Sequence, residues 1–471
     1  MQKVKNDIKI KVGQKFPLTI KRLGINGEGI GYFKRKIAFV PQALPGEVIL
    51  AEVTKVHSKY LNAKIKKIRK ASPDRVEPVD NYDVGGIELE HLAYSKQLEF
   101  KTDVIRQSLE KFKPTNYENM ELRPTLGMEV PYEYRNKAQF QVRKVKGNKV
   151  IAGLYKPNSH ILVDLPTFKT QMPLTMEIMR KIVKLLEKWN ISIYDERRNS
   201  GILKTVVIRQ TLKTEQVQVV FVTARNNCAN LNQVVNEIMS AYPQIVSVMQ
   251  NINPSRSSLV WGEETFKLAG TDRLLEQLGD IKFELSARSF FQLNPSQTEV
   301  LYTEVKKALD LKEDETLVDA YCGVGTIGLF VSPDAKEVRG MDIIPEAIED
   351  AKKNAELSGR KNIHYEVGKA EDLFAKWTKN NFVPDALVVD PPRTGLDDKM
   401  IETILKYRPN KFVYVSCNPS TLARDLVKLV KIYNVEYIQS VDMFPQTARV
   451  EAVVKSVSYT HLRAHETELH L

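Results

Sequence analysis

From about residue 271 to residue 457, short apolar runs typical of buried strands alternate with amphipathic runs typical of helices. The strand-like runs include LVDAY, VRGMD, IHYEV, ALVVD and FVYVSC, and the helix-like runs include PEAIEDAKKNAEL and TLARDLVKLVKI. This alternation predicts an α/β architecture in which helices cover both faces of a parallel sheet. Ligands of such sheets bind beyond the carboxyl ends of the strands, so we expect the functional side chains there.

Two of these runs end in side chains that can carry chemistry. FVYVSCN places Cys417 at its end, and VVDPPRTG places Asp390 before two prolines. If both strands lie in the same sheet, the thiol and the carboxylate share one crevice. A single cysteine in such a place is either a small buried hydrophobic residue or a nucleophile, and position alone leaves both open.

A glycine-rich segment between a strand and a helix indicates a cofactor site. The segment is DAYCGVGTIG, from Asp319 to Gly328, and Asp342 ends the next strand-like run. The glycines allow a close approach of the backbone to a ligand, and a carboxylate about twenty residues later suits the hydroxyls of a ribose. This pattern predicts an adenosine-containing cofactor but does not separate NAD from S-adenosylmethionine. An NAD-dependent dehydrogenase is therefore an open alternative at this point.

The positive charge is concentrated at the N-terminus. Residues 1–75 contain 18 Lys and Arg against 5 Asp and Glu, while the whole chain carries a net charge of +12. Short alternating runs between residues 8 and 70, separated by glycine-rich turns such as GINGEGIG, predict a five-stranded barrel of the oligonucleotide-binding (OB) type. Tyr32, Phe33 and Tyr60 lie among the cations, a combination that suits stacked bases and phosphates. Core packing of the rings and a solvated basic surface are the alternatives.

The rest of the chain predicts the domain organisation. A proline-bearing linker at 72–83 precedes an expected helix from about His91 to Lys113. Residues 130–270 are rich in strand signals, with a hairpin expected at 145–150 and one helix at 174–189. We therefore expect an RNA-binding barrel, a central β-rich domain and a C-terminal α/β domain. Their expected bounds are 1–70 for the barrel, 71–92 with 121–270 for the central domain, and 93–120 with 271–457 for the α/β domain.

The cysteine count and hydropathy exclude several classes of protein. Cys228, Cys322 and Cys417 are too few for a disulfide framework or for a metal site of four thiolates. Reduced thiols are typical of cytoplasmic proteins, so we expect a cytoplasmic location. No apolar run approaches the length of a transmembrane helix, and nothing in the sequence indicates an obligate protein partner.

The last fourteen residues fit nothing before them. We expect residues 458–471, SYTHLRAHETELHL, to be a non-native tail. His461, His465 and His470 are not taken as a metal site, because nothing nearby orders them.

Five segments occur together in one order: ARSFFQLNPSQ at 287–297, VDAYCGVGTIGL at 318–329, VVDPPRTGL at 388–396, VSCNPSTLARDL at 415–426 and FPQTARVE at 444–451. From residue 1 to about 457 the chain resembles the RNA uracil-C5 methyltransferases, particularly those that act on 23S ribosomal RNA. The resemblance implies an N-terminal TRAM domain, a class I (Rossmann-like) methyltransferase domain, and methylation of C5 of uridine in 23S ribosomal RNA with S-adenosyl-L-methionine. A dehydrogenase or a non-catalytic RNA-binding protein leaves these motifs unexplained. A transfer-RNA uracil-C5 methyltransferase uses the same catalytic residues and is the alternative.

The resemblance also implies roles for single residues. Cys417 is expected to be the nucleophile that adds to C6 of uracil, and Glu451 the general base that removes the C5 proton. The cofactor-binding residues are expected to be Gln292, Tyr321, Asp342 and Asp390, and the substrate-binding residues Phe290 and Arg393. A core position for Phe290 and a structural ion pair for Arg393 are the alternatives.

The chain departs from the family pattern in two places. At the positions where many members have cysteines for an iron–sulfur cluster, this chain has Pro78, Val84, Ile87 and Met172. We therefore expect an apolar core there and no iron–sulfur cluster. Arg449 stands where the family usually has His, and its charge, two residues before Glu451, is a candidate for stabilising that carboxylate.

Overall fold

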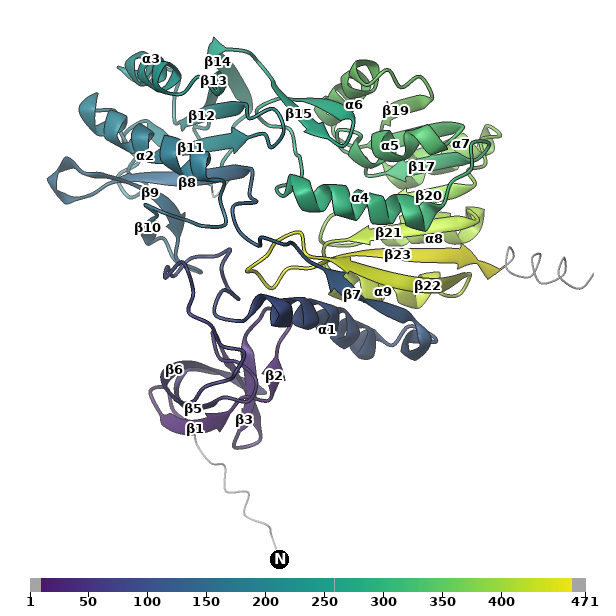
Figure 1. Cartoon of the computed structure of the whole chain (residues 1–471), viewed down its shortest axis with the longest axis horizontal. Helices are drawn as coiled ribbons and strands as arrows, with labels where there is room; N and C mark the ends of the chain where they lie inside the picture. Colours follow the sequence, from purple (N-terminus) through teal and green to yellow (C-terminus); the bar gives the residue numbers. More distant parts are fainter. Residues whose placement is uncertain (1–9, 258, 460–471) are drawn as a thin grey trace, which may run out of the picture.

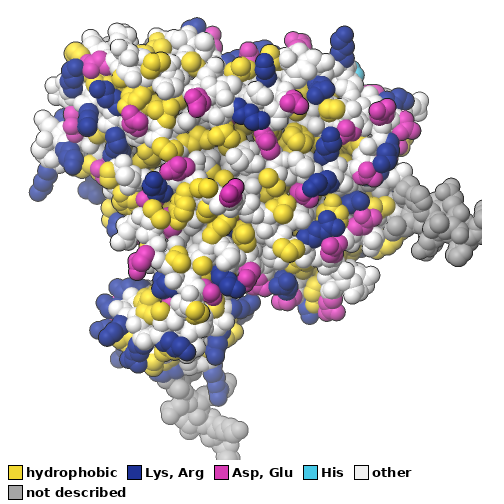
Figure 2. Space-filling model, viewed as in Figure 1, with side chains coloured by type: hydrophobic (Ala, Val, Ile, Leu, Met, Phe, Trp, Pro, Cys, Tyr) yellow, Lys and Arg dark blue, Asp and Glu magenta, His cyan; other side chains and the backbone are white. Residues whose placement is uncertain are grey.

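The computed structural model describes residues 10–257 and 259–459, which form three sheet-based units (Figure 1). The N-terminal unit is one six-stranded sheet in the order β1-β5-β6-β4-β3-β2. Its strands are β1 (Lys15–Thr19), β2 (Arg22–Leu23), β3 (Gly29–Phe33), β4 (Lys36–Val40), β5 (Val48–Val56) and β6 (Tyr60–Lys70). Lys and Arg side chains cluster over this unit at the lower left of Figure 2. The predicted β-rich, basic N-terminal unit is confirmed.

The predicted number of five strands in this unit is wrong. Residues 10–12 of the first expected run lie outside any strand, and residues 8 and 9 lie outside the described residues. Part of the stretch expected to be a turn forms β3 instead. A Cβ on Gly31 would stand 2.7 Å from the Thr19 carbonyl oxygen, so this glycine permits β3 to cross closely over β1. The glycines therefore serve close strand contact as well as turns.

The central unit is a seven-stranded sheet in the order β10-β9-β8-β11-β12-β13-β14. Its strands are β8 (Lys137–Lys144), β9 (Val150–Tyr155), β10 (Leu162–Asp164), β11 (Leu203–Gln210), β12 (Val217–Thr223), β13 (Ile245–Ile252) and β14 (Glu264–Gly270). Helices α2 (Pro173–Lys188) and α3 (Leu231–Ala241) pack on one face, where they bury alternate side chains of β8 and β11. The expected hairpin is confirmed, with the short helix η2 (Lys146–Asn148) between β8 and β9.

The C-terminal unit is an eight-stranded sheet in the order β19-β18-β17-β20-β21-β23-β22-β7. Its strands are β17 (Thr316–Ala320), β18 (Glu337–Asp342), β19 (Ile363–Val367), β20 (Ala386–Val389), β21 (Lys411–Ser416), β22 (Tyr433–Val441), β23 (Glu451–Ser458) and β7 (Glu121–Leu126). The hairpin of β15 (Leu274–Leu278) and β16 (Ile281–Leu285) forms a separate two-stranded sheet.

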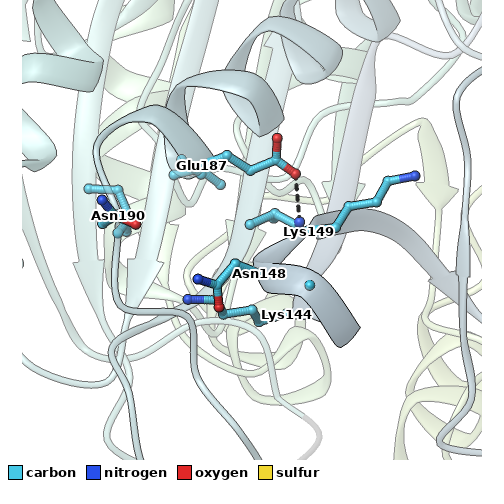
Figure 3. Close-up of a pocket in the computed structure, with 9 residues that line it drawn as sticks. Lys144, Asn148, Lys149, Glu187 and Asn190 are labelled. Carbon is cyan, nitrogen blue, oxygen red and sulfur yellow. Dashed lines mark hydrogen bonds between the residues drawn. The ribbon is translucent and has the colours of Figure 1, made fainter.

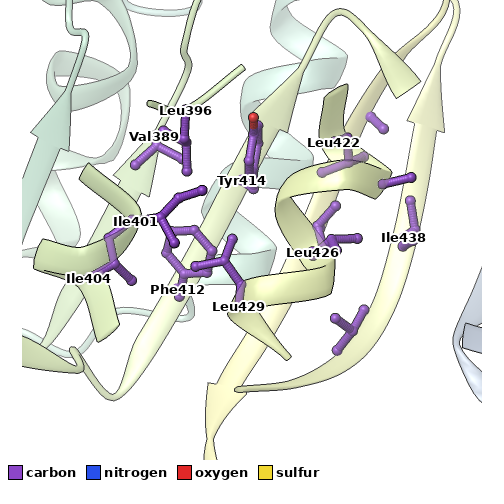
Figure 4. Close-up of a cluster of buried hydrophobic side chains, with 14 of the residues drawn as sticks. Val389, Leu396, Ile401, Ile404, Phe412, Tyr414, Leu422, Leu426, Leu429 and Ile438 are labelled. Atoms are coloured by element: carbon purple, nitrogen blue, oxygen red, sulfur yellow. The ribbon is translucent and has the colours of Figure 1, made fainter. Parts of the chain in front are cut away.

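Helices cover both faces of the C-terminal sheet, as predicted. One face carries α1 (Tyr94–Phe112), α7 (Ala370–Lys379), α8 (Asp398–Tyr407) and α9 (Pro419–Leu429). The other carries α4 (Pro295–Leu309), α5 (Thr326–Val331) and α6 (Pro345–Leu357). The short helices are η1 (Tyr117–Asn119) and η3 (Ser332–Asp334). Figure 4 shows part of the first core, in which apolar side chains of α8 and α9 pack against β20, β21 and β22.

The expectation of a wholly parallel sheet is wrong at one end. Strands β19, β18, β17, β20 and β21 are parallel, but β23 runs antiparallel to both β21 and β22. The segment 442–450 that joins β22 to β23 contains no helix, so it cannot form the crossover that a parallel pair needs. The antiparallel end of the sheet is therefore a consequence of this short connection.

Two expected domain boundaries differ from the structure. Strand β7 pairs with β22, so the boundary expected between residues 120 and 121 would divide the C-terminal sheet. Ser458 belongs to β23, so the boundary expected before it falls inside a strand. Residues 460–471, with the three histidines of the expected tail, lie outside the described residues. Within the described part of the chain, no helix is long and apolar enough to span a membrane.

Candidate active site

The predicted site residues meet at one edge of the C-terminal sheet. The parallel strands β17, β18, β20 and β21 end there, next to Tyr321, Asp342, Asp390 and Cys417. Because β23 runs in the opposite direction, it begins at the same edge with Glu451. A crevice beyond the carboxyl ends of the strands is where an α/β sheet binds its ligands.

Strand register places Cys417 beside Glu451. The last pair of β21 and β23 is Ser416 with Ala452, and one further step in this antiparallel register sets Cys417 opposite Glu451. Opposed residues of such a pair have Cα atoms about 4.5–5.5 Å apart and side chains on the same face. Side chains alternate between the two faces of the sheet along β21 and β23. This alternation places the side chains of Cys417 and Glu451 on the face that α4 covers.

The pKa values of these two groups reflect a buried site. Burial, followed by the carboxylates of Glu451 and Asp390, raises the pKa of Cys417 to about 11, and the guanidinium of Arg393 acts in the opposite direction. Burial and the charge of Asp390 raise the pKa of Glu451 to about 8, again against Arg393. Glu451 is only 6% exposed. In the substrate-free protein, burial therefore favours the protonated form of both groups.

Asp390 lies at the end of β20, where burial raises its pKa to about 7. Its charge raises the pKa of both Cys417 and Glu451, so the three groups lie close to one another. Tyr302 on α4, which the sequence did not single out, is fully buried beside them. Its pKa is raised by burial and by the charges of Asp390 and Glu451, while its hydroxyl is 2.8 Å from Thr326 Oγ1.

The turn that carries Cys417 is held by hydrogen bonds. Asn418 accepts from the Ser420 N–H through Oδ1 at 3.1 Å, and its amide Nδ2 donates to the Arg393 carbonyl oxygen at 2.9 Å. Thr421 Oγ1 donates to the same carbonyl at 3.3 Å. Pro419 then starts α9, whose N-terminal dipole lies directly after the thiol and favours a thiolate. These bonds hold the backbone of Arg393 next to the nucleophile.

Arg393 and Arg449 have different positions. Arg393 is exposed and forms no ion pair with any described residue, which does not support the alternative of a structural ion pair; its substrate-binding role stays a prediction. Arg449 is also exposed, but it does not act on the pKa of Glu451; the cation that lowers this pKa is Arg393. The charge of Arg449 acts instead on Arg135 of the central unit.

The loop before Glu451 is anchored to α1, a feature that sequence reasoning missed. Lys101 and Asp442 form an ion pair in which both side chains are completely buried, and Lys101 Nζ also donates to the Phe444 carbonyl at 3.0 Å. Gln97 and Gln446 are joined by two hydrogen bonds, of 2.8 Å and 3.0 Å. Because a buried charge without its partner is costly, these contacts fix the loop that leads into β23.

The glycine-rich turn fits a cofactor that contains adenosine. Gly323 has a φ of +55°, and no atom lies within 4 Å of the place where a Cβ would stand. Its N–H donates to Asp342 Oδ2 at 3.0 Å, and Ile344 N–H donates to Asp342 Oδ1 at 2.9 Å. Tyr321 has a φ of +66°, a strained value that persists where function requires it. Within the described residues Asp319 Oδ1 is buried without a hydrogen-bond partner.

Two loop residues differ in exposure in a way that bears on substrate binding. Phe290 is 69% exposed, so the alternative of a core ring is wrong, whereas the adjacent Phe291 is 3% exposed and fills the core. Gln292 is 9% exposed, and its carbonyl oxygen accepts from Asn136 Nδ2 at 3.1 Å. The loop therefore presents one free aromatic ring while its backbone is fixed to the central unit.

The other cysteines lie away from this edge. Cys228 packs against the core of the central unit, and Cys322 is 6% exposed within the glycine-rich turn. At the positions of the family's iron–sulfur cysteines, Val84 and Ile87 are buried in the central core, Met172 is buried, and Pro78 is half-buried. No group of three or more metal-ligating side chains occurs among residues 10–257 and 259–459.

A separate hollow of about 360 Å³ is not part of this edge. It lies between the β8–β9 hairpin and the end of α2 (Figure 3). Glu187 accepts there from the Val150 N–H at 2.7 Å, a hydrogen bond that fastens the hairpin to the helix.

Comparison with known proteins gives a consistent result. Residues 93–456 match the model of the family described as tRNA (Uracil-5-)-methyltransferase, and residues 9–66 match the TRAM domain. The chain belongs to the tRNA (uracil-5-)-methyltransferase family. It therefore combines a TRAM domain with an α/β methyltransferase domain that depends on S-adenosylmethionine, as the sequence predicted.

Relatives of high similarity cover nearly the whole chain. An uncharacterized RNA methyltransferase of Lactiplantibacillus plantarum is 58% identical over 95% of this chain and 93% of its own length. An uncharacterized RNA methyltransferase of Bacillus anthracis is 54% identical over 96% of this chain and 98% of its own length. Among solved structures, the tRNA (uracil-54, C5)-methyltransferase of Pyrococcus abyssi in complex with S-adenosyl-L-homocysteine is 28% identical with a TM-score of 0.75. That structure covers 94% of this chain and 100% of its own.

Proposed function

We propose that this family member methylates C5 of specific uridines in 23S ribosomal RNA through a covalent bond between Cys417 Sγ and C6 of uracil. The observation that carries the proposal is the position of Cys417 and Glu451 one step beyond the last pair of β21 and β23, Ser416 with Ala452, where the charge of Glu451 acts on the thiol. This chemistry needs one thiol nucleophile and one base within reach of adjacent ring carbons. We place the activity in the cytoplasm, where a reduced thiol persists.

Each step of the proposal is assigned to a side chain. Cys417 releases its proton to solvent, and the thiolate adds to C6, which makes C5 an enolate carbon. Arg393 and the N-terminus of α9 stabilise the thiolate. S-adenosylmethionine supplies the methyl group that C5 takes. Glu451, as a carboxylate, then accepts the C5 proton, and the electron pair of that C–H bond forms the C5–C6 double bond while the C6–S bond breaks. The thiolate is regenerated.

The remaining site residues are assigned to binding. Asp342 is proposed to accept the ribose hydroxyls of the cofactor, since its carboxylate is already oriented by two N–H groups. Tyr321, Gln292 and Asp390 are proposed to surround its reacting end. Phe290 is proposed to stack on the uracil after it leaves the RNA stack, a role supported by its 69% exposure.

A transfer-RNA uridine is the second candidate substrate. It is favoured by the Pyrococcus abyssi enzyme, which is named for uracil-54 of tRNA. That enzyme aligns with 94% of this chain, too much to omit the whole of the TRAM domain at residues 9–66. A TRAM domain therefore does not by itself separate ribosomal from transfer RNA.

Mapping 5-methyluridine in both RNAs from cells that lack this protein, beside the parent cells, distinguishes the candidates. We expect 5-methyluridine to disappear from defined positions of 23S ribosomal RNA while tRNA keeps its methyl groups. Loss from tRNA alone would transfer the proposal to the second candidate, and loss from neither would refute both.

A further inference from the structure

A polar stripe runs along β8 on the sheet face opposite to α2 and α3. Lys137, Gln139, Gln141 and Arg143 are partly exposed and alternate with three buried apolar side chains that face the helices. Over these residues the stripe is on the order of 20 Å long. The stripe is unusual because a strand in the middle of a sheet often has apolar side chains on both faces. Here one face of β8 carries two cations and two amides.

One end of the stripe lies next to the loop that contains Phe290. Asn136 holds the loop that contains Phe290, through its bonds to the backbone of Gln292 and Leu293. Lys137 is directly opposite Arg209 in the β8–β11 register, and like charges so placed repel each other. Neither forms an ion pair with a described residue, and Arg209 Nη1 is buried without a partner. This end of the stripe therefore brings two basic side chains together without an ion-pair partner, although the carboxyl group of Glu276 acts on Arg209.

The other end of the stripe opens into a pocket of about 320 Å³. Arg143 lies over the ring of Tyr155, at 5.6 Å from its centroid, and Lys204 lies 4.6 Å from the ring centroid of Tyr194. Lys204 is 9% exposed, and its Nζ donates to the carbonyl oxygens of Asn253 at 2.7 Å and Ser255 at 2.6 Å. No described carboxylate forms an ion pair with it, although a buried ammonium normally has one.

The charge and shape of the pocket fit a nucleotide. Arg256 adds an exposed cation at the rim, Leu259 is an exposed apolar residue there, and the single carboxylate in the lining, Glu196, is 3.3 Å from Arg143. The lining is therefore net positive and offers planar groups. Planar side chains that stack on bases, together with cations that follow phosphates, are how proteins bind unpaired nucleic acid.

We propose that this stripe is a track for the single-stranded RNA next to the target uridine, and that the pocket at its end binds one unpaired nucleotide of that RNA. Arg143 and Tyr155 stack on the base, and Lys204 and Arg256 face the phosphates. The inference rests on the proposed function for the identity of the ligand as RNA. The central domain then contacts the RNA at a second point, away from the target uridine. This contact holds the RNA while the target base is displaced.

Binding of a fluorescein-labelled single-stranded oligouridine to the full-length chain tests the proposal without any methyl transfer. The double variant Arg143→Gln, Arg256→Gln is compared with Lys181→Gln, Lys184→Gln, which removes two cations from α2 on the other face of the same sheet. We expect the pocket variant to weaken binding roughly five- to 150-fold, the effect of removing one stacked base. The slope of its affinity against salt should fall by about 0.7 for each phosphate that the variant no longer binds. Equal affinities and equal salt slopes for the two variants would overturn the proposal.

A second measurement separates this inference from the catalytic proposal. A set of RNAs is prepared, each with 5-fluorouridine at the target position and 4-thiouridine at one flanking position. Each RNA is trapped on Cys417 and crosslinked, and the crosslinked peptides are identified by mass spectrometry. We expect crosslinks to β9 or to the 253–257 segment from a few consecutive positions. Trapped RNA that never crosslinks to these segments refutes the track. Failure to trap at all refutes the catalytic proposal, and the oligouridine result still decides the track.

Discussion

Replacing Glu451 by glutamine should stabilise the folded protein, and increasingly so as the pH rises. Glu451 is 6% exposed, and burial with the neighbouring Asp390 raises its pKa from the ordinary 4.5 to about 8. Between these two values the folded state holds a proton that the unfolded state has released. The free energy of unfolding of the parent protein therefore falls as the pH rises through this window. Glutamine has a similar shape and carries no charge, so the variant does not show this fall.

The size of the effect follows from the width of the window. Each pH unit is worth about 1.4 kcal/mol, so the interval between 4.5 and about 8 corresponds to an upper limit of roughly 5 kcal/mol. At pH 6 the variant should gain roughly 2 kcal/mol, and below pH 4.5 nothing. For a domain of this size each kcal/mol shifts Tm by about 2–4 °C, so the difference in Tm is large enough to measure.

Thermal unfolding of both proteins from about pH 5 to about pH 9, without cofactor, is the assay. Glu313→Gln, which removes an exposed carboxylate, is the matched control and should follow the parent within about 0.5 kcal/mol. Parallel stability curves for the parent and Glu451→Gln, or a variant that is less stable than the parent at the alkaline end, would refute the reasoning. Either result would mean that Glu451 is ionised and well paired in the folded protein.

Three further predictions concern turnover, the metal content and RNA binding. Glu451→Gln should still form the adduct with ordinary substrate RNA but release it slowly, so a denaturant-resistant gel shift accumulates; full turnover without an adduct would place the base elsewhere. Protein purified without oxygen should be colourless and free of iron, because the family's cysteine positions are apolar here; stoichiometric iron with acid-labile sulfide would contradict this. The triple variant Lys67→Gln, Arg69→Gln, Lys70→Gln, which changes exposed residues of β6 without removing a described ion pair, should bind RNA more weakly and reduce the salt slope by roughly 0.7–0.9 for each phosphate that is no longer bound. An unchanged slope would mean that this part of the N-terminal unit is a solvated surface.

Local sequence patterns predicted the helices and strands well where the apolar residues of the pattern are also the residues that the element buries. The apolar run at Phe412 and the amphipathic run after Pro419 form β21 and α9 as expected, because each buries one consistent set of side chains. The end of a strand is also visible in sequence, which is why Cys417 and Asp390 were placed at one edge.

Features that depend on long-range contacts could not be predicted. The ion pair of Lys101 with Asp442 joins residues 341 positions apart, and no local pattern marks either as buried. Gly31 was expected in a turn, because sequence cannot show that another strand crosses over it. Phe290 and Phe291 are identical in type, and only tertiary packing decides which ring is exposed.

The polar stripe of β8 has a signal in the sequence, whereas the pocket at its end has none. The segment from Lys137 to Arg143 alternates polar and apolar residues with a period of two, a pattern that predicts a half-exposed strand. The lining of the pocket comes from β8, β9, β11 and residues 159–160, 194–196, 253–257 and 259–260, which no local pattern brings together.

The most direct test of the catalytic proposal is covalent capture by RNA that contains 5-fluorouridine. Fluorine at C5 cannot be removed as a proton, so the bond between Cys417 and C6 should persist after methyl transfer. Incubation of the protein with S-adenosylmethionine and fluorinated 23S ribosomal RNA should give a species that survives denaturation, with the RNA attached to the peptide that contains Cys417. Cys417→Ala should give none, while Cys228→Ser gives as much as the parent. An adduct that persists in Cys417→Ala, or an active enzyme that forms none, would contradict the assignment of Cys417 as the nucleophile.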